Sequence, residues 1–157
     1  MTARPGSCRR NSAPAERERL LFNLRGEPLV ILDLMFDHVS FGVADLPRSK
    51  HFYDQALKRL GYVCLSESGD SLGYGRNAVR LWIGRAERPV APDPGSGLHF
   101  CFVAAIRENV DRFHAAALAA GGKDNGKPGL RASYGDSYYA AFVIDPDGYR
   151  LEAFCGS

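Results

Sequence analysis

Hydrophobic and polar positions along residues 36–88 predict a strand, a helix and three further strands. Residues 36–43 mix apolar and small residues at the spacing of a strand. Asp45 can cap the helix that follows, with Pro47 in its first turn, and apolar residues recur every three or four positions until Gly61 ends it. Short strands separated by glycine and serine turns are expected near 62–67, 71–75 and 78–84.

The same order of elements starts again after a proline- and glycine-rich linker at residues 89–97. Residues 98–103 predict a strand, and residues 110–119 predict an alanine-rich helix. The polar, glycine-rich residues 123–133 are expected to be mostly loop. Two strands, 138–144 and 149–155, complete the segment and are joined by the turn tetrapeptide Asp145-Pro146-Asp147-Gly148.

A fixed offset of 61 positions relates the two segments. Identical residues stand at this offset in the first strand, in the helix and at the helix end: His38 and His99, Phe41 and Phe102, Phe52 and Phe113, Ala56 and Ala117, Leu57 and Leu118, Gly61 and Gly122. One offset shared by strand, helix and cap indicates an internal duplication. After a change in loop length, Arg80-Leu81-Trp82 aligns with Arg150-Leu151-Glu152. We therefore predict an α+β fold of two tandem βαβββ modules, about residues 36–88 and 97–156, within one domain over residues 35–157.

Composition excludes several classes of protein. At 157 residues the chain is about one domain long, and its hydrophobic content of 45% and charged content of 24% are those of a globular protein. The formal net charge of +2 gives no basic field for nucleic-acid binding, and no stretch approaches the ~20 apolar residues of a membrane span. The four cysteines form no CxxC pair, which favours free thiols in a cytoplasmic protein.

Residues 1–34 differ from the rest of the chain, because they carry six arginines among proline, serine and alanine. Arg25 and Glu27 interrupt the apolar stretches, so the segment has no unbroken apolar core of the kind a signal peptide needs. Organised patterning begins directly after Met35. We interpret residues 1–34 as an N-terminal extension that is either disordered or the product of an over-extended gene start.

Two histidines and one glutamate are the candidates for chemistry. His38 and His99 occupy matched positions at the first strand of each module, and Glu152 lies on the last strand of the second. Two imidazoles and one carboxylate can hold a divalent metal while leaving coordination positions open. Each residue taken singly also has a structural interpretation, as a histidine that begins an apolar strand or as a solvated glutamate.

Three neighbouring residues are placed outside this site. His51 and His114 fall at ordinary amphipathic positions of the two helices and are expected at the surface. Asp37 precedes His38 directly, and neighbours on a strand point to opposite faces, so Asp37 is not expected to contact the histidine.

The two ends of the duplicated region resemble a known family. Phe36-Asp37-His38-Val39, Val43-Ala44-Asp45-Leu46-Pro47-Arg48-Ser49, Leu60-Gly61-Tyr62 and the closing segment 145–152 are similar to the glyoxalase/bleomycin-resistance/dioxygenase superfamily, the vicinal oxygen chelate fold. The resemblance covers residues 36–156 and implies that the two modules form a curved mixed sheet around a central cavity. It also implies that one divalent metal (Zn, Ni, Co, Mn or Fe) is bound by His38, His99 and Glu152.

The sequence departs from familiar members of that superfamily at three positions. Glyoxalase I-like members bring a fourth ligand, usually a glutamate, from the last strand of the first module, where this chain has Trp82. Extradiol dioxygenases carry a tyrosine three residues before the Asp-Pro turn and a histidine several residues earlier, where this chain has Phe142 and Ser133-Tyr134-Gly135. Antibiotic-binding members lack the metal ligands, whereas this chain keeps three. The resemblance thus implies a three-ligand site with Trp82 in the fourth direction.

We expect a divalent-metal-dependent, glyoxalase-like lyase or isomerase whose small substrate chelates the metal through vicinal oxygens, with Glu152 as ligand and catalytic residue. A loop at residues 123–136 could cover the cavity and meet an anionic substrate, and the candidate substrate contacts are Trp82, Arg131, Tyr134 and Tyr139. Two alternatives stay open: a metal-free small-molecule binding or resistance protein, and an Fe(II) extradiol-type dioxygenase. No nucleic-acid or membrane partner is expected, and the modules could pair within one chain or across a homodimer.

Overall fold

The computed structural model describes residues 21–22, 28–29, 36–90, 93 and 95–156. The chain divides into two units, Met1–Met35 and Phe36–Ser157. In the first unit, strands β1 (Leu21–Phe22) and β2 (Pro28–Leu29) pair antiparallel. The interpretation of residues 1–34 otherwise lies outside the described residues. The second unit carries every candidate site residue.

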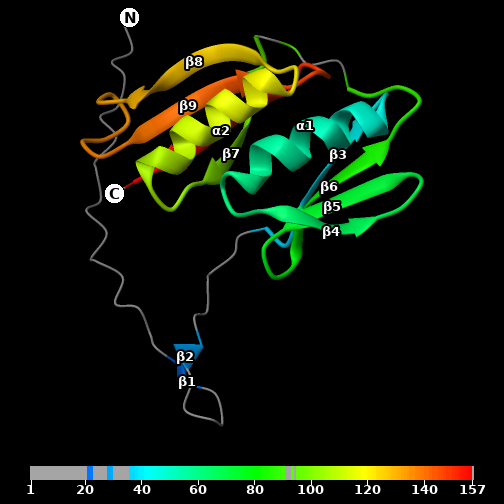
Figure 1. The fold of residues 1–157 in the computed structure, drawn as a ribbon, viewed down its shortest axis with the longest axis horizontal. Helices are drawn as coiled ribbons and strands as arrows, with labels where there is room; N and C mark the ends of the chain where they lie inside the picture. Colours follow the sequence, from blue (N-terminus) through cyan, green and yellow to red (C-terminus); the bar gives the residue numbers. More distant parts are fainter. Residues whose placement is uncertain (1–20, 23–27, 30–35, 91–92, 94, 157) are drawn as a thin grey trace, which may run out of the picture. The chain divides into compact units, whose positions relative to one another are not determined.

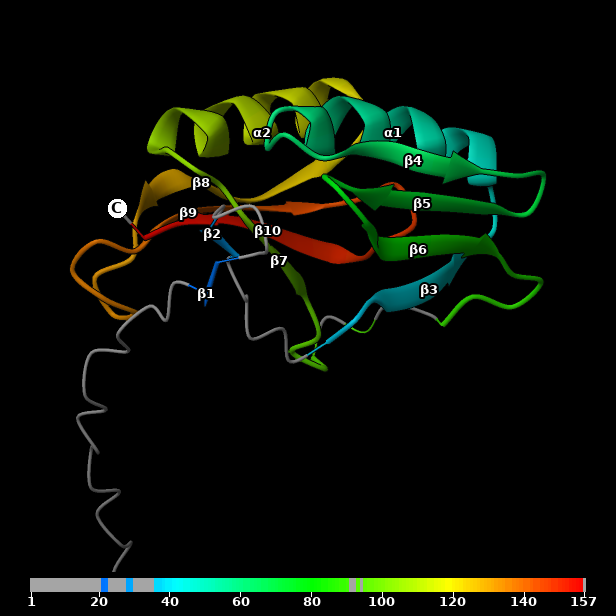
Figure 2. The same ribbon diagram turned by 90° about the horizontal axis from the view of Figure 1, so that it is seen from below.

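The first module has the predicted order of elements: β3 (Val39–Val43), α1 (Leu46–Lys58), β4 (Val63–Glu67), β5 (Ser71–Gly75) and β6 (Val79–Arg85). Its strands form a sheet in the order β3-β6-β5-β4, in which β3 and β6 are parallel and the other pairs antiparallel. The Asp45 carboxylate accepts the N–H of Arg48 at 3.0 Å and so caps α1, as predicted. Figures 1 and 2 show α1 along one side of this sheet.

The second module repeats that order: β7 (Phe100–Val103), α2 (Arg107–Ala119), β8 (Lys123–Leu130), β9 (Tyr139–Ile144) and β10 (Arg150–Cys155), with the sheet order β7-β10-β9-β8. The repeat extends to the strand register. Trp82 pairs with Ser40 across β6 and β3, and Glu152 pairs with Cys101 across β10 and β7, so Trp82 and Glu152 occupy equivalent positions. The predicted α+β fold of two tandem βαβββ modules is confirmed.

Strand β8 corrects one prediction, since residues 123–130 are a strand and not a loop. The strand lies at the edge of its sheet, where a proline and two glycines are tolerated, and its pairing with β9 shifts register twice. Asp124 joins the polar start of the strand to α2, because its Oδ1 lies 2.9 Å from His114 Nε2. The same oxygen accepts the N–H of Gly126 at 3.0 Å within the strand. His114 was expected at the surface, and the structure instead buries it, at 7% exposed.

The two modules share one core. The helices lie side by side (Figure 2), and the core includes Phe52, Tyr53 and Phe113, none of which is exposed. Phe41 of β3 stacks on Phe100 of β7 with ring centroids 5.1 Å apart. Since side chains alternate along a strand, residues adjacent to core positions point to the sheet face opposite the helices. That face is where the candidate site residues have to be sought.

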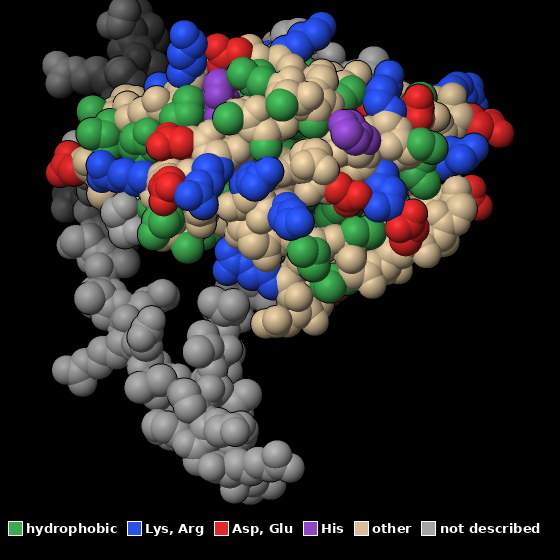
Figure 3. Space-filling view, viewed as in Figure 1, with side chains coloured by type: hydrophobic (Ala, Val, Ile, Leu, Met, Phe, Trp, Pro, Cys, Tyr) green, Lys and Arg blue, Asp and Glu red, His purple; other side chains and the backbone are tan. Residues whose placement is uncertain are grey.

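The outer face over the helices carries acidic and basic side chains interspersed with one another, and no large area of one sign is seen there (Figure 3). Within the described part of the chain, no helix is long and apolar enough to cross a membrane.

Candidate functional site

The second module brings one histidine and one carboxylate together. His99 lies just before β7, and Glu152 lies on the neighbouring parallel strand β10 between the core residues Leu151 and Ala153. The alternation of β10 therefore turns Glu152 away from the helices. His99 Nε2 lies 3.0 Å from Glu152 Oε2. The Glu152 side chain is 3% exposed and that of His99 is 46% exposed, so a buried carboxylate contacts an open imidazole.

Tyr138 and Cys101 complete the surroundings of Glu152. The hydroxyl of Tyr138 donates to Glu152 Oε1 at 2.6 Å, so both carboxylate oxygens have partners. Burial first, and the Glu152 charge second, raise the pKa of the free thiol Cys101 to about 12. Burial also raises the pKa of Tyr138 above its usual value. At neutral pH both groups therefore keep their protons, and Cys101 is not a thiolate.

The hairpin register could have revealed Tyr138 from the sequence. The turn 145–148 pairs Phe142 with Glu152, so 138, 140 and 142 share the face of Glu152, and odd-numbered residues share the helix face. Tyr139 follows that rule: its hydroxyl donates to Asp111 of α2 at 2.8 Å, and Arg107 lies over its ring. The structure does not bring Tyr139 to the His99–Glu152 pair.

His38 belongs to a separate cluster in the first module. Its Nδ1 lies 2.8 Å from Asp37 Oδ2, and Arg80 donates to Asp37 Oδ1 at 2.8 Å and to the Asp37 carbonyl at 2.7 Å. The expectation that Asp37 would not contact His38 was wrong, because both residues precede β3 and strand alternation does not govern them. The hydrogen bond with His38, followed by the charge of Arg80, lowers the pKa of Asp37.

One chain does not assemble the three expected ligands. Among the described residues, no group of three or more His, Cys, Asp or Glu side chains is placed to hold a metal ion. His99 and Glu152 are in contact, whereas His38 contacts Asp37. Of the three expected ligands, the structure therefore brings together His99 and Glu152 only, an imidazole and a carboxylate whose chemistry suits a divalent metal.

Trp82 lies on the face of the first sheet that corresponds to the Glu152 face of the second. It packs over Gly73, where an added Cβ would come within 2.9 Å of Trp82 Cζ3 and of Val79 Cγ1. The indole therefore occupies the space that a side chain at Gly73 would fill. Half-buried Trp82 thus lies at the position where the second module has its carboxylate.

Arg131 and Tyr134 lie near the Glu152 face of the second module. The Arg131 guanidinium lies over Phe142, the strand partner of Glu152, with 5.3 Å between the guanidinium carbon and the ring centroid. Its Nη2 donates to the Lys127 carbonyl at 2.6 Å, while its buried Nε has no protein partner among the described residues. Tyr134 is 66% exposed and meets Tyr138 edge-on. The two predicted substrate contacts therefore remain candidates.

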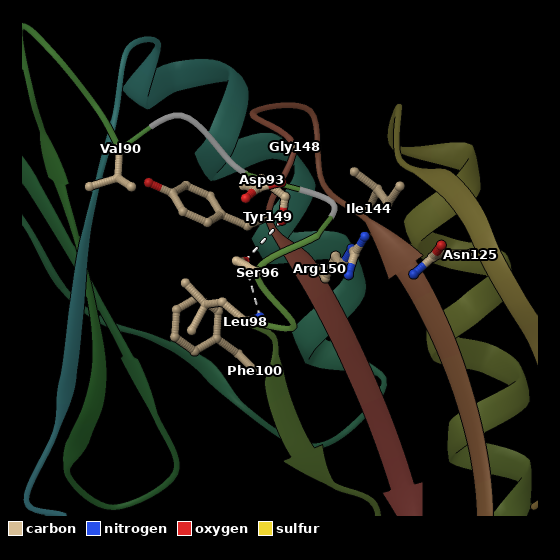
Figure 4. Close-up of a pocket in the computed structure, with 10 residues that line it drawn as sticks. All are labelled: Val90, Asp93, Ser96, Leu98, Phe100, Asn125, Ile144, Gly148, Tyr149 and Arg150. Atoms are coloured by element: carbon tan, nitrogen blue, oxygen red, sulfur yellow. Dashed lines mark hydrogen bonds between the residues drawn. The ribbon is translucent and has the colours of Figure 1, made fainter.

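Two cavities border the module junction. One of about 420 Å³ has His99, Cys101 and Arg80 in its wall, and its other lining residues are mostly apolar and aromatic, among them Phe36, Val39, Tyr62, Leu81, Phe102 and Val103. The other, of about 380 Å³, lies beside the linker (Figure 4), with Leu98, Phe100 and Tyr149 on one side and Asn125 and Arg150 on the other. His99 lines the first cavity and Glu152 lines neither, so the first cavity is connected with the pair through His99.

Comparison with known proteins agrees with this architecture. Residues 35–153 match the family model of the Glyoxalase/Bleomycin resistance protein/Dioxygenase superfamily. The chain is 28% identical over 120 residues to the protein YqjT of Bacillus subtilis, across 73% of this chain and 94% of that protein. It is 33% identical to a glyoxalase/bleomycin resistance protein from Albidiferax ferrireducens, whose crystal structure matches with a TM-score of 0.67 over 78% of this chain and 98% of that one.

More distant solved structures share the fold alone. A glyoxalase-related enzyme from Fulvimarina pelagi is 21% identical with a TM-score of 0.61, over 78% of this chain and 88% of that one. The fosfomycin resistance protein FosX from Listeria monocytogenes is 14% identical with a TM-score of 0.60, over 80% of this chain and 96% of that one. These similarities identify the architecture around the His99–Glu152 pair and leave its chemistry to be argued from the residues.

Proposed function

Because the chain belongs to the Glyoxalase/Bleomycin resistance protein/Dioxygenase superfamily, we propose that it is a divalent-metal-dependent enzyme of the lyase or isomerase type. Its substrate is a small molecule that reaches the metal through two neighbouring oxygens. The observation that carries the proposal is the contact of His99 Nε2 with Glu152 Oε2 at 3.0 Å, on a buried carboxylate at the face opposite the helices.

The donor chemistry supports Zn, Ni, Co, Mn or Fe in this position. A neutral imidazole and a carboxylate are common ligands of these ions. A bound ion would supply Lewis acidity toward two adjacent oxygens of the substrate. Glu152 and His99 would hold the ion and would leave positions open for those oxygens.

We propose that His38 of a second copy completes the ligand set. Asp37 binds Nδ1 of His38 and so leaves Nε2 available, the arrangement in which a carboxylate orients a metal-binding histidine. Exposed apolar side chains lie in the wall of the cavity that contains His99: Phe36 is 64% exposed and Val103 is 60% exposed. A second copy that covers this surface would bury both and bring a His38 to each His99–Glu152 pair.

We infer from Arg131 that the proposed substrate carries an anionic group, which the guanidinium would bind. Its buried Nε has no protein partner, and its guanidinium lies over Phe142, directly across the strand pair from Glu152. A planar guanidinium pairs well with a carboxylate or a phosphonate. We therefore propose a small hydroxy- or oxo-acid as the substrate class, with Trp82 and Tyr134 as further contacts.

Subunit mixing tests this arrangement. His38→Ala and His99→Ala are each purified, shown to bind little metal, then mixed, partly unfolded in urea and refolded together. If each site takes His38 from one copy and His99 from the other, a mixed dimer regains one intact site. Random pairing then restores about a quarter of a metal per chain, because half of the dimers are mixed. No recovery in mixtures that do form mixed dimers would contradict the two-copy site. Activity toward hydroxy- and oxo-acids, lost with a chelator and restored by one metal, tests the enzyme assignment.

A metal-free binding protein is the second candidate, and the cavity of about 420 Å³ favours it because its lining is mostly apolar and aromatic. The two candidates differ in metal content. Ligand binding that is unaffected by a chelator, in a protein without stoichiometric metal, would support the binding protein.

A further inference from the structure

We propose that Tyr138 is the positioning residue of Glu152: its hydroxyl occupies Oε1 and leaves Oε2 as the single oxygen that binds the metal beside His99 Nε2. The inference rests on the proposed function and concerns the same site. Its basis is the pair of contacts at Glu152, with Tyr138 donating to Oε1 at 2.6 Å and His99 lying 3.0 Å from Oε2.

The tyrosine hydroxyl is held in place by the packing of its ring. The ring lies against Phe154, with centroids 4.0 Å apart, and Tyr134 meets it edge-on at 5.3 Å. Phe154 shares the face of Glu152, because the two residues are separated by two positions on β10. A ring fixed on both sides points its hydroxyl at one carboxylate oxygen and keeps Glu152 in one rotamer.

The consequence concerns the number of open positions on the metal. A glutamate with both oxygens free can bind an ion through two oxygens and occupy two coordination positions. With Oε1 held by Tyr138, Glu152 would bind the ion through Oε2 alone. A substrate that chelates through vicinal oxygens needs two adjacent open positions, and the single-oxygen mode preserves them.

The first module shows the same division of roles. Asp37 holds Nδ1 of His38 and leaves Nε2, just as Tyr138 holds Oε1 of Glu152 and leaves Oε2. Partners that orient metal ligands in this way typically contribute about 10–100-fold to metal affinity. In each case the hydrogen bond occupies one donor atom of the proposed ligand and leaves the other one for the metal.

Adjacent tyrosines provide a matched test. Tyr138→Phe removes the hydroxyl from Glu152 and keeps the ring between Phe154 and Tyr134, whereas Tyr139→Phe removes a hydroxyl from Asp111 on the helix face. Each protein is stripped of metal and titrated with Co²⁺ alone. The dissociation constant comes from competition with a chelator, and the visible absorption spectrum of bound Co²⁺ reports its coordination.

We expect Tyr138→Phe to weaken Co²⁺ binding by about 10–100-fold and to change the absorption bands. Tyr139→Phe should match the wild type in both respects, and circular dichroism should show that both variants are folded. Equal affinity and equal spectra for Tyr138→Phe and wild type would overturn the inference and leave the proposed function intact. A wild-type protein that binds no Co²⁺ would overturn the proposed function, and the inference with it.

Discussion

The contact between helix α1 and the β9–β10 turn joins the two modules through one buried carboxylate. Asp145 is 2% exposed and accepts three hydrogen bonds: from the Tyr53 hydroxyl at 2.6 Å, from the N–H of Asp147 at 2.9 Å and from the N–H of Tyr149 at 2.7 Å. Tyr53 itself is fully buried. Asp145→Ala therefore leaves three donors without this acceptor, one of them on a side chain that water does not reach.

The magnitude follows from those bonds. Hydrogen bonds to a charged group contribute roughly 1.5–3 kcal/mol each, and the two backbone donors at the turn can recover part of theirs from water. Burying the Asp145 carboxylate costs free energy, and Asp145→Ala removes that cost. The net loss of stability is therefore smaller than the sum of the three hydrogen bonds. We expect Asp145→Ala to lower the free energy of unfolding by about 3 kcal/mol. Tyr53→Phe removes a single bond and should lower it by roughly 1–2 kcal/mol.

The pH dependence has a definite sign. Burial, the largest influence, raises the pKa of Asp145 above its usual 3.8 in the folded state. The folded protein then binds this proton more tightly than the unfolded chain does, so the contribution of Asp145 to stability falls as the pH rises from about 4 through the raised pKa. The difference between wild type and Asp145→Ala should therefore be larger near pH 4 than at pH 7.

Urea unfolding at both pH values measures these differences, with fluorescence of the single tryptophan, Trp82, and circular dichroism as probes. A loss of about 0.5 kcal/mol or less for Asp145→Ala, as for an ordinary surface substitution, would contradict a stabilising role of the Asp145 hydrogen bonds. A difference that grows from pH 4 to pH 7 would refute the electrostatic part of the reasoning.

Two further substitutions test the packing of Trp82 and the role of Arg131. Gly73→Ala should lower the free energy of unfolding by roughly 1–3 kcal/mol and shift the fluorescence of Trp82, because the added Cβ would come within 2.9 Å of Trp82 and Val79. Gly69→Ala is the control, because a Cβ added there has nothing within 4 Å. Equal effects of the two substitutions would contradict the close packing of Trp82 on Gly73. Arg131→Gln should weaken binding of oxalate to the metal-loaded protein about tenfold, as expected for the loss of one charge-assisted hydrogen bond. Arg112→Gln, which removes an exposed pair with Glu108 on α2, should leave oxalate binding unchanged, and an equal loss in both variants would argue against a role of Arg131.

The sequence contained most of the fold, because the duplication constrains both modules together. The offset that relates His38 to His99 also relates Ser40 to Cys101, and the structure repeats it in strand register. Strand β8 escaped prediction because its residues are polar and glycine-rich. Its strand form depends on pairing with β9 and on the contact between Asp124 and His114, which local patterning does not contain.

The candidate site was predictable in part. His99 and Glu152 were identified by matched repeat positions and by resemblance, and the structure brings them together. Tyr138 was missed in favour of Tyr139, although the pairing of Phe142 with Glu152 around the turn assigns even-numbered residues to the site face. Asp37 was missed because the alternation rule was applied to residues that precede the strand.

Metal content per chain shows whether His99 and Glu152 hold a metal ion. The protein is purified without chelator or histidine tag, and elemental analysis compares wild type with His99→Ala and with His51→Ala, an exposed histidine on α1. The account predicts about one metal per chain in wild type and His51→Ala, and little in His99→Ala, since only His99 contacts Glu152 among the histidines compared. Little metal in all three proteins, or equal metal in all three, would contradict it.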